Sequence, residues 1–484
     1  VSADARPLGE PRGTALNERR RIMADVGVIG AGVAGLTAAY QLQQAGHDVQ
    51  VLEASRRVGG KIETEQTDGF LVELGPNSLR GSGAVLNRII DALQLEDAIV
   101  EARDTASNRY VVRDGVPQPL PTSLGSFLTT DLLSTAAKLR LLGEPFAASK
   151  TDGEADESVA SFVRRRLGPE VLTYVVDPFV GGIFAGDPHQ LSLRNAFERL
   201  HDLEANHGSL TRGMLHRIWS RNASSSTGQR GVFSFQNGLQ ALPTALADAL
   251  EDQVQTNAPV TAMRQDDTRW HVATRTPDGA TQMHFYDAVI CTVPLPQLAE
   301  MDLNTTLGHG VFDEVPYPPV SVLALGFRAD DVDHPLDGFG MLVPQAEEEL
   351  RILGTIFSSS LFPGRAPDGH VLLTTFVGGM REPELGRLPT SALRPIVESD
   401  LQALLGVHGS PTFVRHRTWE QAIPQYTRGY DQVKHALQEL ESEHPGLFFA
   451  GNYRQGISVG DAMESAVQAA ERVQHSLDAT LSLS

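Results

Sequence analysis

Three glycines stand at the spacing that a phosphate-binding turn requires. Gly30, Gly32 and Gly35 follow a short apolar run, and residues 36–44 after them have helical composition. The first glycine allows a tight bend, the second lets a pyrophosphate approach the backbone, and the third lets helix and strand lie close together. The helix N-terminus supplies amide donors and a partial positive charge. The predicted dinucleotide contacts are Gly30, Ala31, Gly32, Val33, Ala34 and Gly35.

A carboxylate ends the strand predicted at residues 48–53. Glu53 lies 18 residues after Gly35, where it can accept hydrogen bonds from a ribose diol. An acidic residue here also argues against a 2′-phosphate, which an arginine would accompany. A glycine turn alone is compatible with no ligand at all. The strand, turn, helix and second strand, together with Glu53, favour a nucleotide site.

Two further segments follow Glu53. Gly59 and Gly60 would let the backbone approach a large cofactor, and Lys61 could meet pyrophosphate charge. Residues 73–80 read ELGPNSLR, which on its own is typical of an ordinary turn.

The elements that would position these residues alternate between helix and strand, which predicts an α/β protein. Hydrophobic periodicity and turn signals predict helices at 84–104, 398–405, 431–444 and 461–477, mostly helical structure over 121–200, a hairpin of 109–113 with 115–120, short strands over 254–292, and β-rich segments at 320–327, 339–343, 351–357, 371–377 and 447–452.

Composition excludes several classes of protein. The 484 residues include 40 Lys and Arg against 60 Asp and Glu, a formal net charge of −20, which disfavours nucleic acid as a partner. A single cysteine, Cys291, excludes an intrachain disulfide and a cysteine-based zinc site. The longest apolar stretch, 26–39, is too short and too glycine-rich to span a membrane. We interpret residues 1–22 as an appendage that fits a signal or transit peptide poorly.

The sequence resembles a known family. The glycine turn, the RVGGK segment at 57–61 and a C-terminal strand that enters Gly451-Asn452 before a helix are similar to the flavin-containing amine oxidase superfamily. Within it, five stretches resemble the protoporphyrinogen oxidase family, and the resemblance runs from about residue 25 to the end. They are GPNSLR (75–80), DPFVGGIFAGDPHQLSL (177–193), GFGMLVP with ILGTIFSSSLFPGRAP (338–344, 352–367), WEQAIPQY (419–426) and GNYRQGISVGDAMESA (451–466).

The resemblance implies a noncovalent FAD cofactor in a Rossmann-like FAD-binding domain. The adenine would meet the backbone of Val260, Trp419 would lie near the flavin, and the last helix, beginning at Asp461, would point its positive end at the flavin. Beyond the glycine turn, the implied FAD contacts are Glu53, Ala54, Gly60, Lys61, Gly75, Pro76, Asn77, Ser78, Val260, Trp419, Ile457, Ser458 and Val459.

The same resemblance implies the substrate side. A porphyrinogen would lie in an apolar slot, and the flavin N5 would accept hydride from it, with dioxygen as the final acceptor and no obligatory catalytic side chain. We find neither a Ser/His/Asp set nor residues at metal-ligand spacing. Arg80 would bind a propionate and Phe339 would stack on a pyrrole, with Gly182 and Val320 nearby; ordinary sheet core remains an alternative for Phe339 and Val320, and a solvated surface position for Arg80.

The implied division combines the FAD domain with a mixed-sheet substrate domain and a mostly helical insert. Its parts are an appendage at 1–23, FAD-binding segments at 24–90, 228–299 and 415–484, substrate segments at 91–120, 201–227 and 300–414, and the insert at 121–200. We expect a cytoplasmic protein; peripheral membrane contact through the insert and a homodimer are both left open.

Three alternatives to protoporphyrinogen oxidation are weighed. Coproporphyrinogen III has four carboxylates instead of two, and Arg80 as the one cation that we can place favours the substrate with two. Another flavin oxidase, for amines or carotenoids, is the second; cysteinyl attachment of its flavin is disfavoured because Cys291 lies in a predicted strand. The third, a lipid-binding chaperone without FAD, conflicts with the intact glycine and Glu53 set.

Overall fold

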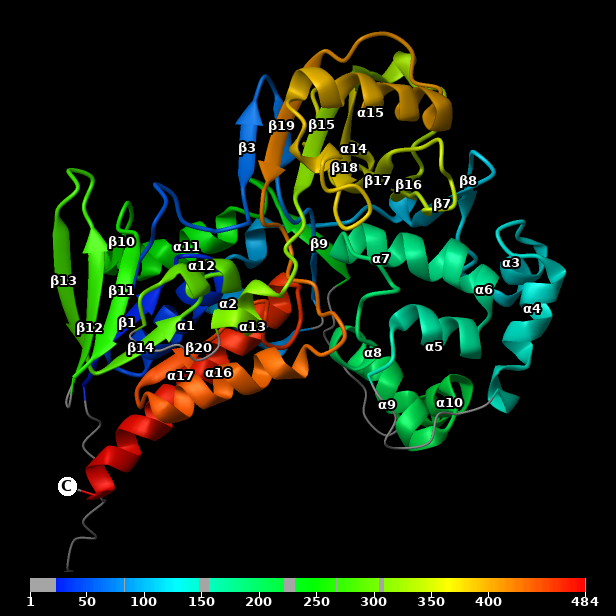
Figure 1. Cartoon of the computed structure of the whole chain (residues 1–484). Helices are drawn as coiled ribbons and strands as arrows, with labels where there is room; N and C mark the ends of the chain where they lie inside the picture. The colour runs from blue at the N-terminus through cyan, green and yellow to red at the C-terminus, as the bar shows by residue number, and fades with distance from the viewer. Residues whose placement is uncertain are drawn as a thin grey trace, which may run out of the picture.

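The computed structural model describes residues 23–81, 83–147, 156–221, 231–266, 269–303 and 309–483. The predicted appendage at 1–22 lies outside the described residues. Figure 1 shows two lobes built on β-sheets, with a group of helices beside the second. The α/β class is confirmed. Among the helices of these ranges, none is both long and apolar enough to cross a bilayer.

A five-stranded parallel sheet forms the first lobe. Apolar strands run in the order β10-β2-β1-β14-β20. Helix α1, which follows the glycine turn, packs against the long C-terminal helix α17 on one face. The bounds are β1 Asp25–Ile29, α1 Val33–Gln44, β2 Asp48–Leu52, β10 Val254–Gln255, β14 Ala288–Cys291, α16 Asp431–Glu443, β20 Leu447–Phe449 and α17 Val459–Leu483. This sheet therefore collects strands from three distant parts of the chain.

A seven-stranded sheet in the order β19-β15-β18-β17-β16-β7-β8 forms the second lobe. Helix α15, Thr390–Leu405, buries Leu393, Val397 and Leu401 in the core on one face of this sheet. The other face carries the site described below. Its strands are β7 Asn108–Arg113, β8 Val116–Pro119, β15 Val320–Arg328, β16 Gly338–Leu342, β17 Ile352–Phe357, β18 His370–Gly378 and β19 Phe413–Trp419.

The helical insert has its own small apolar core. Buried Arg166 joins Glu144 and Glu204 within that core, so distant helices are tied by charge as well as by packing. The helices are α3 Leu124–Thr129, α4 Thr135–Leu142, α5 Val159–Arg166, α6 Pro169–Val171, α7 Asp177–Phe184, α8 Leu193–Ala196, α9 Glu198–His207 and α10 Leu210–Arg221, with a π-helical turn at Leu172–Val176. The helical group thus runs past residue 200, the predicted end of the insert, because Leu203 and Leu210 pack into the same core.

Smaller elements join these parts. They are the sheet β11 Val260–Gln265, β12 Trp270–Arg275 and β13 Thr281–Tyr286; the hairpin β3 Thr64–Thr67 and β4 Phe70–Glu73; the sheet β5 Leu79–Arg80, β9 Val232–Phe235 and β6 Ile99–Glu101; and the helices α2 Ala84–Ala92, α11 Ala241–Ala249, α12 Leu295–Glu300, α13 His309–Asp313 and α14 Ser358–Leu361.

The strand–turn–helix–strand unit at the N-terminus and the hairpin around Asp114-Gly115 are confirmed. The helix predicted over 84–104 is wrong beyond Ala92. Gln94 adopts a positive φ of 56°, which ends the helix, and residues 99–101 pair instead with β9. Helix α15 begins eight residues before the predicted start, and it contains Pro395, a residue that usually marks a boundary.

Candidate active site

The first glycine turn has the geometry of a phosphate cradle. Gly30 has a φ of +99°, and a Cβ on Gly35 would lie 1.9 Å from the carbonyl oxygen of Gly30, so neither position accepts a side chain. Gly32 caps α1 without any side-chain hydrogen bond to the helix amides. The atom nearest to a Cβ on Gly32 would be the Cα of Gly60, 4.0 Å away. The N-terminal amides of α1 therefore face a space that stays open because the glycines around it carry no side chain.

Glu53 closes the back of this turn. Its carboxylate accepts hydrogen bonds from the backbone N–H of Ala31 at 2.7 Å and from Ser55. The N–H of Ala258 binds the carbonyl of Glu53, which brings the segment before Val260 beside it. A carboxylate has about four acceptor positions, so Glu53 can still accept from a ligand hydroxyl. The structure thus brings Glu53 and the segment leading to Val260 to one end of the predicted nucleotide path.

The second glycine segment lies next to the first. Gly59 forms an isolated bridge with Gly32, and Gly59 and Gly60 both have positive φ values. An uncapped helix end bounded by two glycine-lined backbones suits a pyrophosphate, which needs amide donors and close approach. The residues present therefore fit the phosphate and ribose parts of FAD. Ala54 continues this path directly after Glu53.

Lys61, Gly75 and Trp419 converge further along. A Cβ on Gly75 would meet the carbonyl of Lys61 at 1.9 Å, and the indole Nε1 of Trp419 donates to the carbonyl of Leu74 at 2.6 Å. The ammonium of Lys61 stands 4.7 Å from the centre of the Trp419 ring. Burial, together with the nearby cations Arg417 and Arg57, lowers the pKa of Lys61 to about 8. A half-desolvated amine beside an aromatic face can respond to the charge of a bound flavin.

The start of the last helix differs from the prediction. Helix α17 begins at Val459, not at Asp461. The Asp461 carboxylate folds back and accepts from the N–H and hydroxyl of Ser458, because a carboxylate in the first turn satisfies free helix amides. Tyr426 accepts from the N–H of Gly456 at 3.0 Å and so fixes the loop ahead of Ile457. The helix end near residues 457–459 therefore already carries a negative charge.

One face of the seven-stranded sheet presents a half-buried apolar row. Leu342, Gly354 and Phe376 are direct neighbours on β16, β17 and β18, and Ile356 lies one step along on the same face. Val320 is buried in the cluster that contains Phe376 and Trp419. Leu342, Ile356 and Phe376 are not among the site residues predicted from the sequence, because their common face follows from strand register. Their β-strand alternation was the available signal.

Helix α7 covers this row. A Cβ on Gly182 would meet the Cδ2 of Leu342 at 2.3 Å, so the helix backbone lies directly on the sheet. The predicted site residues Gly182 and Val320 therefore do belong to the same region as Trp419. We assign the predicted apolar slot to this row, whose half-buried side chains offer an apolar surface to a flat ring system, with α7 packed on the row at Leu342.

The other two predicted substrate residues lie in different sheets, Phe339 on β16 of the seven-stranded sheet and Arg80 on β5 of a three-stranded one. Phe339 is half-buried at a bulge in β16, where the register shifts between Gly338 and Gly340. The guanidinium carbon of Arg109 lies 5.4 Å from the centre of the Phe339 ring. Arg109 is exposed and pairs with Gly340, which in turn pairs with Ile356. Arg109 is the first residue of the predicted hairpin and was not among the predicted site residues.

Arg80 is exposed on the two-residue strand β5. It pairs with Val232, whose side chain shares a small cluster with Phe339 and Ile356. Arg80 is thus near this end of the slot, and nothing among the described contacts assigns it a partner there. Arg109 is the better-placed cation because it lies in the strand row of the slot itself.

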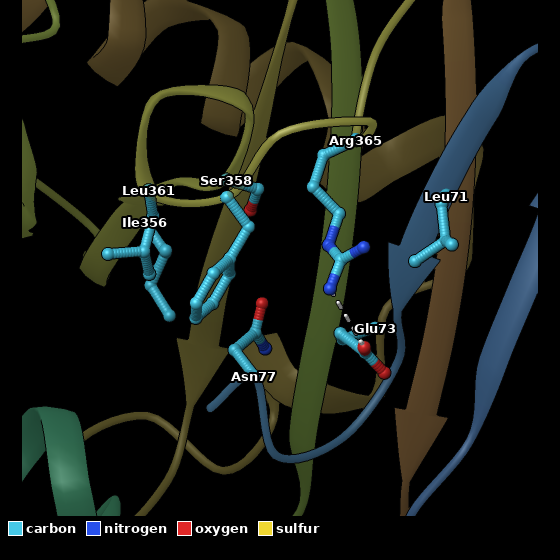
Figure 2. Close-up of a pocket in the computed structure, with 8 residues that line it drawn as sticks. Leu71, Glu73, Asn77, Ile356, Ser358, Leu361 and Arg365 are labelled. Atoms are coloured by element: carbon cyan, nitrogen blue, oxygen red, sulfur yellow. Dashed lines mark ion pairs between the residues drawn. The ribbon is translucent and has the colours of Figure 1, made fainter. Parts of the chain in front are cut away.

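A small cavity lies behind the turn at 75–78. Figure 2 shows Arg365 and Glu73 facing each other across it, with Asn77 and Ile356 nearby. Arg365 is 2% exposed and its closest approach to Glu73 is 4.0 Å. Glu73 accepts from Thr64 and from the N–H of Leu239, yet burial raises the pKa of its carboxyl to about 7. A titrating carboxyl thus lies directly behind the predicted FAD contact Asn77.

We expect Glu73→Gln to change how stability depends on pH. The pKa of Glu73 in the folded chain, about 7, exceeds its ordinary value of 4.5. The protonated group therefore stabilises the fold below about pH 4.5, and this contribution is lost as pH rises through 7. Melting temperatures of the FAD-loaded protein at pH 5.5 and 8 should show Glu73→Gln gaining several degrees relative to wild type at pH 8. Exposed Glu348→Gln is the control and should leave the difference unchanged; an equal offset at both pH values for Glu73→Gln would contradict the titration.

The remaining chemistry-bearing groups are accounted for structurally. Cys291 is fully buried, and burial raises the pKa of its thiol to about 12. Across the described ranges, no group of three or more His, Cys, Asp or Glu side chains is placed to hold a metal ion. The side chains described above could orient and enclose a substrate, and none of them stands out as a base.

This chain is similar to known proteins over most of its length. The family model described as "flavin containing amine oxidoreductase" matches residues 33–474. Protoporphyrinogen oxidase 2 of Arabidopsis thaliana is 38% identical over 93% of this chain and 93% of its own. Coproporphyrinogen III oxidase of Bacillus subtilis is 28% identical over 90% of this chain and 95% of its own. A crystal structure of a candidate protoporphyrinogen oxidase from Exiguobacterium sp. 255-15 superposes with a TM-score of 0.78 at 25% identity, covering 93% of this chain and 99% of that one.

Proposed function

Because this chain belongs to the flavin-containing amine oxidoreductase family, we propose that it is an FAD-dependent oxidase that converts protoporphyrinogen IX into protoporphyrin IX with dioxygen as electron acceptor, in tetrapyrrole biosynthesis. The observation that carries the proposal is the half-buried apolar row on β16–β18, against which α7 packs. It has Trp419 at the end near the FAD path and Arg109 at the other end. Similarity to the protoporphyrinogen oxidase of Arabidopsis thaliana over 93% of both chains supports the same substrate.

When bound, FAD would supply the redox chemistry, accepting a hydride from a saturated carbon and delivering electrons to dioxygen. The turn from Gly30 to Gly35 and Glu53 would hold its nucleotide part. Lys61 and Trp419 would lie beside its ring end. Leu342, Ile356 and Phe376 would exclude water and fix the macrocycle in one plane, which is the entropic part of catalysis.

Arg109 supplies what an apolar slot lacks. A porphyrinogen carries propionates, and a guanidinium binds a carboxylate through two parallel hydrogen bonds. Its position at the end of the row would hold those propionates away from the flavin and so set which meso carbon faces it. One well-placed arginine suits the two neighbouring propionates of protoporphyrinogen better than the four carboxylates of coproporphyrinogen.

The proposal is tested by anaerobic mixing of the FAD-loaded protein with protoporphyrinogen IX, coproporphyrinogen III and a panel of amines, following flavin bleaching at 450 nm, a wavelength typical of oxidised flavin at roughly neutral pH. We expect the fastest bleaching with protoporphyrinogen IX. Faster bleaching by coproporphyrinogen III would reassign the substrate, and bleaching by an amine alone would overturn porphyrinogen oxidation. A colourless, folded preparation would favour a lipid-binding protein without FAD.

We also propose peripheral membrane contact through the insert of a cytoplasmic protein. Leu128, Leu139, Leu142 and Phe146 are 64–86% exposed on α3, α4 and the following turn, where large apolar side chains are unusual on a free surface. Lys138 lies between them and donates to the carbonyl of Leu128 at 2.9 Å. An apolar tip with adjacent basic residues fits an anionic lipid surface, although the net charge of −20 opposes broad adhesion.

We expect wild-type protein to sediment with phosphatidylglycerol vesicles at low salt, and the double variant Leu142→Asp/Phe146→Asp to lose most of that binding. Both substitutions lie on exposed side chains, so FAD content and melting temperature should not change. Phosphatidylcholine vesicles are the control for the electrostatic part. Equal sedimentation of the two proteins would remove this surface from membrane contact.

A further inference from the structure

The loop that follows β18 holds helix α7 at both of its ends. At the helix start, the Nη2 of Arg381 donates to the Oδ2 of Asp177 at 2.9 Å. At the helix end, the N–H of Met380 donates to the carbonyl of Ala185 at 2.8 Å. Ala185 adopts a left-handed conformation, φ 49°, which turns its carbonyl toward this loop. Two consecutive residues thus fix eight residues of helix against the substrate sheet.

The ion pair at the helix start is almost fully buried. The side chains of Arg381 and Asp177 are each 10% exposed. Arg381 also donates to the carbonyl of Val343 at 2.6 Å, directly after β16, and Asp177 accepts from the N–H of Gln345 at 2.7 Å. Burial lowers the pKa of Arg381 and raises that of Asp177, while each partner opposes the shift of the other. Removing one partner would leave a buried charge without its counter-charge.

Close contacts join this ion pair to helix α7, and join the helix to the apolar row. A Cβ on Gly181 would lie 2.7 Å from the Nη2 of Arg381, and a Cβ on Gly182 would lie 2.3 Å from the Cδ2 of Leu342. Consecutive glycines of α7 therefore lie against Arg381 on one side and against Leu342 of the apolar row on the other. Any movement of Arg381 shifts the helix backbone relative to Leu342.

We propose that Arg381 is a positioning residue for the oxidation: by clamping Asp177 and the loop after β16, it holds helix α7 in place against Leu342 of the apolar row, and thereby fixes the surface that the macrocycle would contact. This inference rests on the proposed porphyrinogen substrate. Arg381 does not touch the reacting atoms; it acts through Gly181, Gly182 and Leu342. Its loss should weaken binding of the substrate more than it slows the step after binding.

The test compares Arg381→Leu, Arg381→Lys and the double variant Asp177→Asn/Arg381→Leu with wild type, all loaded with FAD. For protoporphyrinogen IX we expect KM to rise about 10-fold in Arg381→Leu while kcat per bound FAD stays within about 2-fold. Arg381→Lys keeps the charge and should recover part of the loss. The double variant removes both charges and should be no worse than Arg381→Leu, since the two residues act as one unit.

Arg351→Leu is the matched control. Arg351 forms an exposed ion pair with Glu382, the neighbour of Arg381, and its backbone N–H donates to Asp400 of helix α15. Its KM should equal that of wild type. A purely structural role for Arg381 would lower yield and melting temperature without changing KM, and that result would overturn the inference.

Two further outcomes are separated by the same assays. If no porphyrinogen bleaches the flavin of the wild-type protein, the proposed function is wrong, and the proposed role of Arg381 is wrong with it. If wild type turns over and Arg381→Leu has an unchanged KM, only the clamp fails. Should Arg381→Leu not fold, Gly181→Ala takes its place, because the new methyl would lie 2.7 Å from the Nη2 that pairs with Asp177 and would disturb the clamp without removing either charge. An unchanged KM in Gly181→Ala would contradict the proposal.

Discussion

Gly32→Ala is expected to yield a folded protein that binds FAD at least about 100-fold more weakly than wild type, a loss of about 2.7 kcal/mol. Gly32 has an ordinary φ of −68°, and a Cβ there would have no atom closer than 4.0 Å, so the fold tolerates the methyl group. The same methyl would stand at the uncapped amide end of α1, where a pyrophosphate must approach the backbone. Titration of the FAD-free protein with FAD, followed by flavin fluorescence, measures the affinity.

Two other glycines separate cofactor loss from fold damage. Gly35→Ala should lower the melting temperature as well as FAD affinity, because its Cβ would lie 1.9 Å from the carbonyl oxygen of Gly30. Gly46→Ala meets no atom within 4 Å but has a φ of +92°, so it should cost a little stability and no FAD affinity. Full FAD binding by Gly32→Ala would show that the cofactor does not cross this turn.

Arg109→Leu should raise the KM for protoporphyrinogen IX about 10- to 100-fold, because a charge-assisted hydrogen bond to a carboxylate contributes about 1.5–3 kcal/mol. Its side chain is exposed and forms no ion pair among the described contacts, so folding and FAD content should be retained. Steady-state oxygen consumption at varied substrate gives KM and kcat separately. A substrate analogue with esterified propionates should be oxidised equally well by wild type and variant.

Arg80→Ala decides between the two cations. The resemblance to the family points to Arg80, whereas the strand register favours Arg109. We expect the smaller rise in KM for Arg80→Ala. A larger effect at Arg80 would return the propionate to the position expected from the sequence, and no effect at either would remove both from the slot.

The nucleotide part of the site was predictable from sequence because it is local. Gly30, Gly32, Gly35 and Glu53 lie within one strand–turn–helix–strand unit, where residue spacing determines spatial position. The structure confirms that unit and adds the hydrogen bond from Ala31 to Glu53. The contacts with FAD themselves stay predictions.

The slot was harder to predict because it depends on register between strands. Leu342, Ile356 and Phe376 share a face only once β16, β17 and β18 pair as they do. A bulge at Phe339 shifts the alternation and brings Arg109 next to that ring. Neither the strand pairing nor the bulge can be read from a single segment of the sequence. The motif resemblance therefore pointed to Arg80 and did not include Arg109.

The three-part origin of the parallel sheet has a consequence for synthesis of the chain. β14 forms parallel pairs with β1 on one side and with β20, Leu447–Phe449, on the other. A chain leaving the ribosome therefore exposes one edge of β14 until β20 has been made, and such an open strand edge can join other chains. The lobe with the glycine turn can close only once β20 has been made, which makes late folding and early aggregation competing fates of the same intermediate.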